Sequence, residues 1–225
     1  MDDASLFGTI RDRLFTAVVG DVLDRMGHRR QFLPPGLQPL DPESVIVGRA
    51  MPVVEADVFD AAGPGRGPLS GEAFGLLFDA LDDLRAGEVY VAAGASPAYA
   101  LWGGLMTTRA RHLGAAGAIL DGYVRDAREI GALGFPVFSR GLYAQDQGPR
   151  GKVIDWRTPV EIGGVRIAPG DLIFADREGV LVIPQAAEEE AIGAALEKAA
   201  TETEVARAIR AGMPARTAWK TFGVM

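Results

Sequence analysis

The sequence predicts a single α/β domain that ends in helices, and three observations support this fold class. Between residues 87 and 134, apolar strand patterns alternate with helical patterns, which is typical of parallel strands joined by crossover helices. From residue 136 onward the chain changes to short strand patterns separated by turns rich in glycine and proline. The 225 residues contain neither an internal repeat nor a recognisable linker, so we expect one domain over residues 1–225.

The first 27 residues carry helical periodicity. Residues 4–26 show two successive apolar faces at helical spacing, and Gly27 fits the C-cap that ends the second face. We therefore expect two short N-terminal helices within residues 1–27. A proline-rich connection with little regular structure follows them.

The first strand is expected at residues 45–56. Within it, Gly48 and Pro52 favour a bulge or an edge position, because proline cannot donate a hydrogen bond to a neighbouring strand. The segment 57–72 is rich in glycine and proline, and its length suits a lid over a site.

The middle of the chain alternates between helices and strands. We expect, in order, a helix capped by Ser70 and running to Leu84, a buried strand at 87–94, a helix at 103–113, a strand at 115–121, and a short helix from Asp126. Because each strand reaches the next through a helix, we expect these strands to be parallel.

Short strands, tight turns and two final helices make up the second half. The pair Gly163-Gly164 fits a tight hairpin, and residues 169–171 fit another turn. A long helix over 186–211 begins with acidic residues, which suit the positive end of the helix dipole, and a short helix over 214–221 follows. We expect the C-terminal helices, 186–221, to contact a neighbouring subunit.

Composition and charge favour a cytoplasmic protein that handles small molecules. The formal net charge is −7 and the arginines are scattered, so no surface for nucleic acid is expected. The chain has no cysteine, which excludes thiol nucleophiles, thiolate metal sites and disulfides. The N-terminal segment lacks a basic region before an apolar run, and no apolar stretch is long enough to suggest a membrane span.

Several kinds of catalysis are disfavoured by the residues present. The two histidines, His28 and His112, cannot form a histidine-rich metal site. Neither a nucleophile elbow nor a dinucleotide-binding glycine motif occurs. The three lysines, Lys152, Lys198 and Lys220, lie in polar or terminal segments, where a desolvated Schiff-base lysine is not expected. Carboxylates and arginines remain as the candidates for chemistry.

The segment AILDGYVRDAREI (118–130) places Arg125 and Asp126 side by side just after an apolar run. One interpretation is a solvated turn with a surface ion pair, which would contribute little. The other is a site in which Asp126 binds Mg²⁺ or Mn²⁺ and Arg125 binds an anionic substrate through its planar guanidinium group. A single carboxylate suffices for the second interpretation, because Mg²⁺ keeps several of its waters.

Gly103 and Gly104, in the segment WGGLM, open a helix directly after a buried strand. The simplest interpretation is a strand-to-helix turn. Alternatively, the free N–H groups of the helix start would bind an anion that the glycines allow to approach closely. Taken together with Arg125 and Asp126, which follow the next strand, the second interpretation is favoured.

Motifs along most of the chain resemble those of a known family. They are GDVLDRMGHRRQFLPPGLQPLDPESVIVGRA, ALWGGLMTTRARHLGAAGAILDGYVRDAREI, GFPVFSRG, VEIGGVRIAPGDLIFADREGVLVIP and the terminal IRAG. The chain resembles the class II 4-hydroxy-4-methyl-2-oxoglutarate aldolase family, which also contains the regulator of ribonuclease E activity A. The resemblance implies a swivelling β/β/α-type fold, assembled as a homotrimer or a dimer of trimers, with active sites between subunits.

The resemblance also implies roles for individual residues. Asp126 would hold the divalent cation, Mg²⁺ or Mn²⁺, Arg125 would contact the substrate, and Glu129 matches an acidic position that follows. A glutamate from the neighbouring subunit, Glu202 or alternatively Glu204, would order metal-bound water. The pyruvoyl carboxylate of a 2-oxo acid would lie against the backbone of the helix start, at Gly103, Gly104, Leu105 and Met106.

One departure from the family concerns position 104. The aldolases that the chain resembles carry an acid in this loop, where this sequence has Gly104, and the acid is associated with proton transfer. Asp121 and the neighbour's Glu202 are candidate substitutes. The resemblance thus leaves three functions open: a metal-dependent lyase that forms a pyruvate enolate by retro-aldol cleavage or decarboxylation, a non-catalytic regulatory protein, and a repurposed enzyme in which Gly104 makes room for a bulkier substrate. The regulator branch tends to lose the aspartate that this chain keeps as Asp126.

Overall fold

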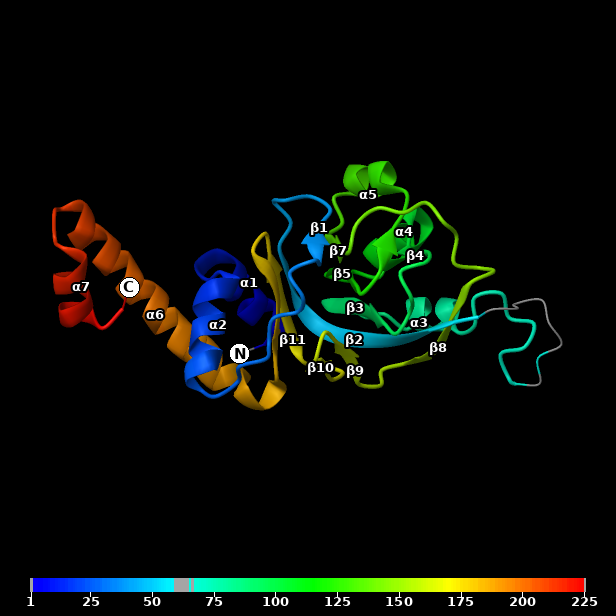
Figure 1. The fold of residues 1–225 in the computed structure, drawn as a ribbon, viewed down its shortest axis with the longest axis horizontal. Coiled ribbons are helices and arrows are strands. Elements are labelled where there is room, and N and C mark those ends of the chain that lie inside the picture. Colours follow the sequence, from blue (N-terminus) through cyan, green and yellow to red (C-terminus); the bar gives the residue numbers. More distant parts are fainter. Residues whose placement is uncertain (1, 59–64, 66, 225) are drawn as a thin grey trace.

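The computed structural model describes residues 2–58, 65 and 67–224 (Figure 1). Part of the expected lid at 57–72 therefore lies outside the described residues. The helices are α1 (Asp3–Arg13), α2 (Thr16–Arg25), α3 (Leu77–Asp82), α4 (Gly104–His112), α5 (Ala127–Leu133), α6 (Glu188–Arg210) and α7 (Ala215–Phe222), with a short 3-10 helix, η1, at Gln185–Ala187. The strands are β1 (Gln38–Pro39), β2 (Ile46–Asp57), β3 (Glu88–Ala93), β4 (Ala100–Trp102), β5 (Gly117–Leu120), β6 (Tyr123–Val124), β7 (Val137–Ser139), β8 (Gly151–Trp156), β9 (Val160–Ile162), β10 (Val165–Ile167), β11 (Leu172–Asp176) and β12 (Gly179–Ile183).

A mixed sheet forms the centre of the domain, with the strand order β1-β7-β5-β3-β2-β11-β12 and β8 also paired with β2. The strands β2, β3, β5 and β7 are parallel, as the sequence predicts for the middle of the chain. The strands of the second half, β8, β11 and β12, are antiparallel to their neighbours. The predicted α/β fold class is confirmed.

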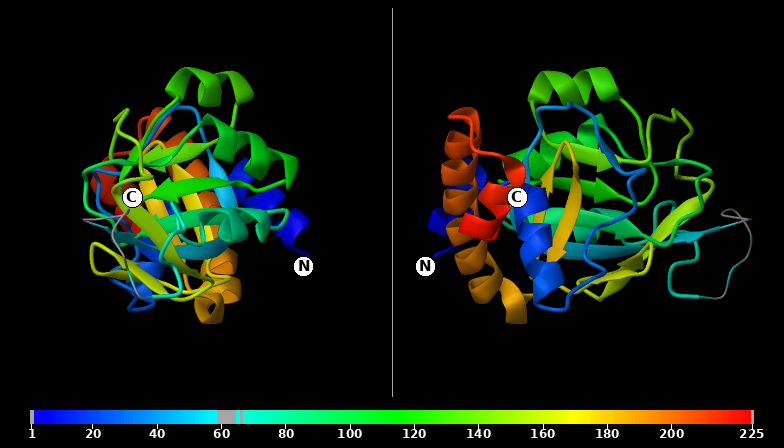
Figure 2. Two further views of the ribbon diagram at one scale, coloured as in Figure 1. Left: turned by 90° about the vertical axis from the view of Figure 1, so that its right-hand side faces the viewer. Right: turned by 60° about the vertical axis from the view of Figure 1, so that its left-hand side comes forward.

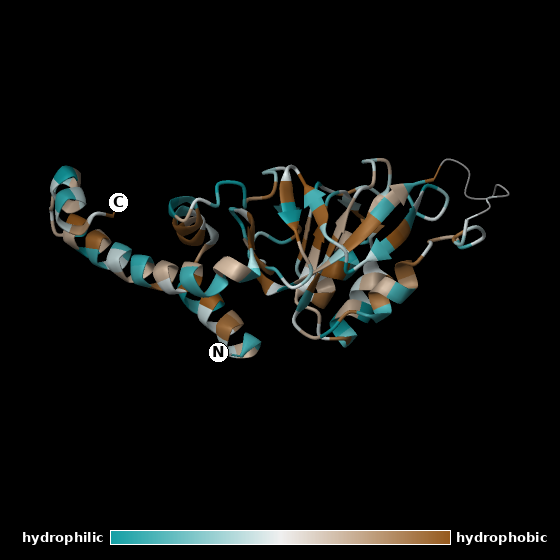
Figure 3. Ribbon diagram, turned by 90° about the horizontal axis from the view of Figure 1, so that it is seen from below, coloured by the Kyte–Doolittle hydropathy of each residue, from teal (hydrophilic) through white to brown (hydrophobic). Residues whose placement is uncertain are grey.

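Apolar side chains fill three adjoining regions around this sheet. One lies under α3, α4 and α5 and is built around residues such as Tyr90, Trp102 and Val137. The opposite face packs against the β9–β10 hairpin, and a third region joins α1 and α2 to α6. Hydropathy colouring shows apolar strands in the body and an alternating pattern along α6 and α7 (Figure 3).

Strand β2 is central, so the expected edge position for Gly48 and Pro52 is wrong. One side of β2 is shared by two partners, since β11 pairs with residues 46–49 and β8 pairs with residues 53–57. Pro52 lies in the interval between them, where the strand needs no N–H donor on that side. A register irregularity does occur, but between Val54 and Glu55 of the β8 pairing.

The helix expected from Ser70 to Leu84 is shorter than the sequence predicts. It begins only at Leu77, and Ser70 donates its backbone N–H to Gly67 instead of capping a helix. The reason is Gly75, which has φ of +62° and forms a bridge to Val153 of β8. This contact holds the preceding residues in turns beside the sheet.

The remaining predicted elements are present with small shifts in their bounds. Gly163 and Gly164 both have positive φ and close the antiparallel β9–β10 hairpin, as expected. The C-terminal helices α6 and α7 extend as an arm from the body beside α2 (Figure 2). Among the described residues, no helix combines the length and the apolar character needed to cross a membrane.

Candidate active site

Two short parallel strands bring the glycine turn and the Arg125-Asp126 pair together. β4 pairs with β6 so that Trp102 lies opposite Val124, and the N–H of Arg125 donates to the carbonyl of Trp102 at 3.0 Å. Gly103 directly follows β4 and Arg125 directly follows β6, so the two residues lie side by side. The convergence that the sequence predicts is confirmed, although β4 and β6 themselves were not expected.

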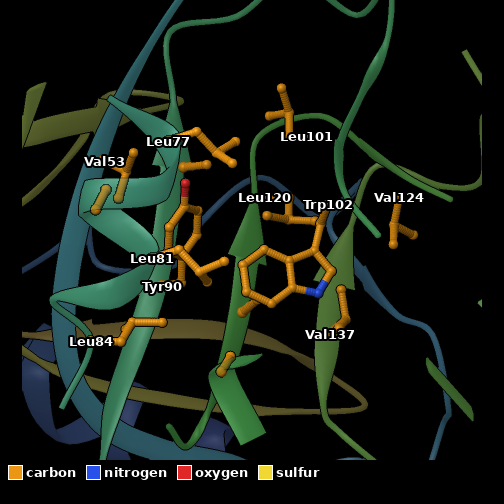
Figure 4. Close-up of a cluster of buried hydrophobic side chains, with 14 of the residues drawn as sticks. Val53, Leu77, Leu81, Leu84, Tyr90, Leu101, Trp102, Leu120, Val124 and Val137 are labelled. Atoms are coloured by element: carbon orange, nitrogen blue, oxygen red, sulfur yellow. The ribbon is translucent and has the colours of Figure 1, made fainter. Parts of the chain in front are cut away.

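Trp102 fixes the floor of this region. Its indole is buried and lies 5.0 Å from the ring of Tyr90 between centroids (Figure 4). It also stacks on Phe135, with 6.1 Å between the ring centroids. The indole N–H donates to the hydroxyl of Thr107 at 2.7 Å, and that hydroxyl donates to the carbonyl of Gly103 at 3.0 Å. A buried and fully hydrogen-bonded aromatic group gives the turn above it one fixed geometry.

Asp126 occupies an unusual backbone conformation, with φ of 58° and ψ of 33°. Non-glycine residues adopt this left-handed region at a cost, and such residues are concentrated at functional sites. The conformation turns the carboxylate back toward α4, where Oδ2 accepts the backbone N–H of Gly104 at 3.0 Å. The side chain is 45% exposed, so the carboxylate remains accessible to a ligand.

The glycines at 103 and 104 let two carboxylates lie close to the backbone of this turn. A Cβ at Gly103 would lie 2.7 Å from Oδ2 of Asp126. A Cβ at Gly104 would overlap the carboxylate of Glu129, which projects from α5. The space beside Gly104 is taken by the Glu129 carboxylate in this structure, and the idea that Gly104 makes room for a bulkier substrate remains a prediction.

The guanidinium group of Arg125 is held between two carboxylates. Its Nη1 lies 2.7 Å from Oδ1 of Asp146, and its Nε lies 3.9 Å from Oδ2 of Asp126. The side chain is partly exposed, so these pairs stabilise the fold little and chiefly orient the group. The guanidinium group is therefore oriented across the turn before an anionic substrate binds.

A cavity of about 250 Å³ opens beside these groups. Gly103, Leu105 and Met106 line it together with Arg125 and Asp126, as predicted, whereas Gly104 does not. The N–H groups of Leu105 and Met106 belong to the first turn of α4, where a helix has no internal acceptors. The rest of the wall is mostly apolar, and it comes from α3, the residues before it and β4: Phe74, Leu77, Phe78, Ala100 and Leu101.

A wider hollow of about 380 Å³ lies elsewhere, between α2 and the β9–β10 turn. It is lined by the exposed Arg29 and Arg30 among others, and none of the ion pairs between described residues crosses it. Size alone would favour this hollow. The smaller cavity holds the strained aspartate and the oriented arginine, and we assign the chemistry there.

Beneath the cavity lies a carboxyl group that the sequence analysis missed. Glu55 is only 2% exposed, and its Oε2 accepts a hydrogen bond of 2.8 Å from the side-chain amide of Gln147, which lines the cavity. Burial raises the pKa of Glu55 to about 8, and the hydrogen bond from Gln147 only partly opposes this. Oε1 of Glu55 and the hydroxyl of Tyr90 have no hydrogen-bond partner among the described residues.

The donor set fits a hard divalent cation that keeps most of its water. No three aspartate, glutamate, histidine or cysteine side chains gather into a metal cluster within the described ranges. Asp126 offers one accessible oxygen beside a glycine cradle that a Cβ would fill, which suits Mg²⁺ or Mn²⁺ more than a cation that needs a full protein cage.

Three predicted residues lie away from the cavity in this chain. Asp121 does not line it and instead accepts a hydrogen bond of 2.7 Å from Arg140. Glu202 and Glu204 lie on α6, and Glu202 pairs with Lys198 at 2.6 Å. The roles of Glu202 or Glu204 in a neighbouring subunit remain predictions, because a single chain does not test them.

For some of the site residues that were not predicted, the sequence does contain an indication. Glu55 interrupts an apolar strand, which marks a buried carboxyl group, and Asp146 and Gln147 stand in a polar segment rich in glycine. Their contact with the site depends on a long-range pairing of β8 with β2. Nothing local in the sequence specifies that pairing.

Comparison with known proteins shows the family of the chain. The model of the RraA-like family, described as Aldolase/RraA, matches residues 16–182. A protein of Halalkalibacterium halodurans named "Putative 4-hydroxy-4-methyl-2-oxoglutarate aldolase" is 33% identical over 195 residues, which cover 86% of this chain and 84% of that protein.

Solved structures share the fold. An uncharacterised protein from Pseudomonas syringae superposes with a TM-score of 0.83 at 28% identity, covering 97% of this chain and 94% of that one. The RraAS2 protein of Streptomyces coelicolor, titled an unusual member of the RNase ES inhibitor RraA protein family, has a TM-score of 0.77 at 25% identity and covers 92% of this chain and 97% of its own.

Proposed function

Because the chain belongs to the RraA-like family, we propose that it is a divalent-metal-dependent lyase that breaks a C–C bond of a 2-oxo acid and releases pyruvate. One observation carries the proposal: Asp126, Arg125 and the start of α4 converge on one cavity. The name of the Halalkalibacterium halodurans relative supports the same class of reaction.

The residues would divide the work as follows. Asp126 would hold Mg²⁺ or Mn²⁺, which when bound supplies a Lewis acid that withdraws charge from the keto oxygen. The N–H groups of Leu105 and Met106 would bind the substrate carboxylate at the start of α4. Arg125 would stabilise the negative charge that develops on the keto oxygen as the bond breaks.

Retro-aldol cleavage and decarboxylation both pass through a pyruvate enolate. In retro-aldol cleavage the C3–C4 bond breaks, the C4 hydroxyl gives up its proton as the carbonyl forms, and the electron pair passes to C3 as an enolate. In decarboxylation the departing group is CO₂. Protonation at C3 then gives pyruvate in both cases. Glu129 is the carboxylate nearest to position 104 and is available for proton transfer.

The assembly belongs to the same proposal. We expect a homotrimer or a dimer of trimers in which Glu202 or Glu204 of one subunit approaches the cavity of the next. The exposed arm formed by α6 and α7 supports this expectation, since it carries the half-exposed Trp219 and the partly exposed Ile209.

The direct test measures pyruvate release from oxaloacetate and from a panel of 4-hydroxy-2-oxo acids, with Mg²⁺ and with EDTA. We expect the variant Asp126→Ala and the EDTA-treated protein to lose release. The control Asp82→Ala removes an exposed aspartate that pairs with Arg109 at 2.7 Å outside the cavity, and it should retain release. Full turnover in Asp126→Ala would refute the metal role.

A non-catalytic regulator is the second candidate, favoured by Gly104 and by the likeness to the Streptomyces coelicolor RraAS2 protein. Titration with Mg²⁺ and oxalate separates the two. Binding of oxalate without turnover of any substrate in the panel would favour the regulator.

A further inference from the structure

The cavity combines a few charged groups with a mostly apolar lining. Arg125, Asp126 and Asp146 supply the charges, and Phe74 and Phe78, whose rings meet edge to face at 5.6 Å, belong to the apolar lining. Phe78 is 61% exposed and Leu105 is 84% exposed, so large apolar side chains open directly onto the entrance. Uncovered apolar groups at the mouth of a site indicate an apolar ligand or partner.

The described residues of this chain supply little positive charge at the cavity for a second substrate carboxylate. Among the described residues that line it, Arg125 is the only cation, and it stands beside the carboxylates of Asp126 and Asp146. One substrate carboxylate can use the start of α4. A second one would have to share Arg125 with Asp126 and Asp146 or lie against aromatic and aliphatic groups, and burying an unpaired carboxylate there is strongly unfavourable.

The apolar lining of the cavity is suited to a ring or a branched alkyl group. A cavity of about 250 Å³ lies at the small end of ligand sites and accommodates a metabolite with one such group. Phe74 and Phe78 present both an edge and a face, the arrangement in which aromatic rings attract one another. Leu105 and Met106 complete the wall from α4.

We infer that this site takes 4-hydroxy-2-oxo acids that have a single carboxylate and an apolar C4 substituent of about the size of an aromatic ring, rather than 2-oxo dicarboxylic acids. The inference rests on the proposed lyase function and narrows its substrate class. The products are pyruvate and an apolar aldehyde or ketone, and the bond changes are those of the retro-aldol reaction described above.

The first experiment compares kcat/KM for 4-hydroxy-2-oxo-4-phenylbutanoate and 4-hydroxy-4-methyl-2-oxoglutarate, measured as pyruvate release by the intact protein with Mg²⁺. We expect the phenyl compound to be favoured about tenfold or more, the scale on which apolar pockets discriminate. The reverse ranking would overturn the inference and leave the lyase function standing.

A binding measurement separates failure of the inference from failure of the function. Calorimetric titration with 2-oxo-4-phenylbutanoate and with 2-oxoglutarate, two 2-oxo acids that lack the C4 hydroxyl on which retro-aldol cleavage depends, needs no turnover. Tighter binding of 2-oxo-4-phenylbutanoate supports the inference even if neither aldol is cleaved, in which case the lyase proposal alone fails. Tighter binding of 2-oxoglutarate overturns the inference.

Matched variants test the cavity itself. Leu105→Arg adds a cation at an exposed position of the wall and should shift selectivity toward the dicarboxylate. Ile154→Arg adds the same charge at an exposed position of β8 outside the cavity and should leave selectivity unchanged. Phe78→Ala should lower kcat/KM for the phenyl compound about tenfold while changing that for the dicarboxylate little. Unchanged selectivity in both Leu105→Arg and Phe78→Ala would also overturn the inference.

Discussion

Replacing Glu55 with glutamine should remove a pH dependence of stability that originates in one buried carboxyl group. Burial raises the pKa of Glu55 to about 8 in the folded protein, from an ordinary value of 4.5. Between these values the folded state keeps the proton and the unfolded state loses it. The contribution of Glu55 to the free energy of unfolding is therefore fully present below pH 4.5 and is lost as the pH rises toward 8.

The size of this effect follows from the pKa difference. Each pH unit inside the window costs about 1.4 kcal/mol, so raising the pH from 5 to 7 should lower the free energy of unfolding by on the order of 2–3 kcal/mol. In Glu55→Gln the side chain stays neutral, and its carbonyl oxygen can still accept the hydrogen bond from Gln147. The variant should lack this decline.

Urea unfolding at pH 5, 6 and 7 measures the effect directly. The stability difference between Glu55→Gln and the parent protein should grow in favour of the variant across this range. The control Glu161→Gln replaces an exposed glutamate of β9, and its difference from the parent should stay constant. The other ionisable groups around Glu55, which are Tyr90, Tyr99, Asp57 and Lys152, are shared by all three proteins. Parallel stability curves for Glu55→Gln and the parent would refute the reasoning.

Three further changes probe the site and the scaffold. Arg125→Lys should lower kcat/KM for pyruvate release by about 100-fold, because an ammonium cannot reproduce the planar guanidinium contacts, and steady-state kinetics would show this. Gly104→Asp should push the Glu129 carboxylate aside and weaken substrate binding by adding negative charge, which a titration with oxalate would detect; stronger binding would contradict the geometry. Arg157→Ala should lower the free energy of unfolding by about 2–3 kcal/mol, because its guanidinium donates to two partly buried carboxylates, and urea unfolding at pH 7 measures it.

The elements with strong local signals were predictable from the sequence. The hairpin at Gly163-Gly164 and the strand over residues 87–94 depend on backbone conformation and on runs of apolar residues, both of which are local properties. The helix from Ser70 failed because Gly75 bridges to Val153, a residue 78 positions later in the chain. A long-range contact of this kind overrides the local helical pattern and leaves no trace in it.

The candidate site also contains residues that local sequence patterns predicted and residues that they did not. Gly103 and the pair Arg125-Asp126 were predictable, because each follows an apolar strand and parallel strands end at the same edge. Asp146 and Gln147 were not, since they reach the cavity through a loop that precedes β8. The apolar wall was missed for a similar reason: the rings of Phe74 and Phe78 look like ordinary core residues until their exposure is known.

The position of Glu129 bears on whether the protein can be catalytic at all. The resemblance to the aldolases expects an acid at residue 104, and a glycine there first suggests a site without a proton carrier. In the structure the Glu129 carboxylate lies where a side chain at 104 would begin, close to the N-terminal turn of α4. A carboxylate from α5 thus lies beside this turn although residue 104 is a glycine. Gly104 alone therefore does not exclude a lyase, and the choice between lyase and regulator depends on turnover with the metal bound at Asp126.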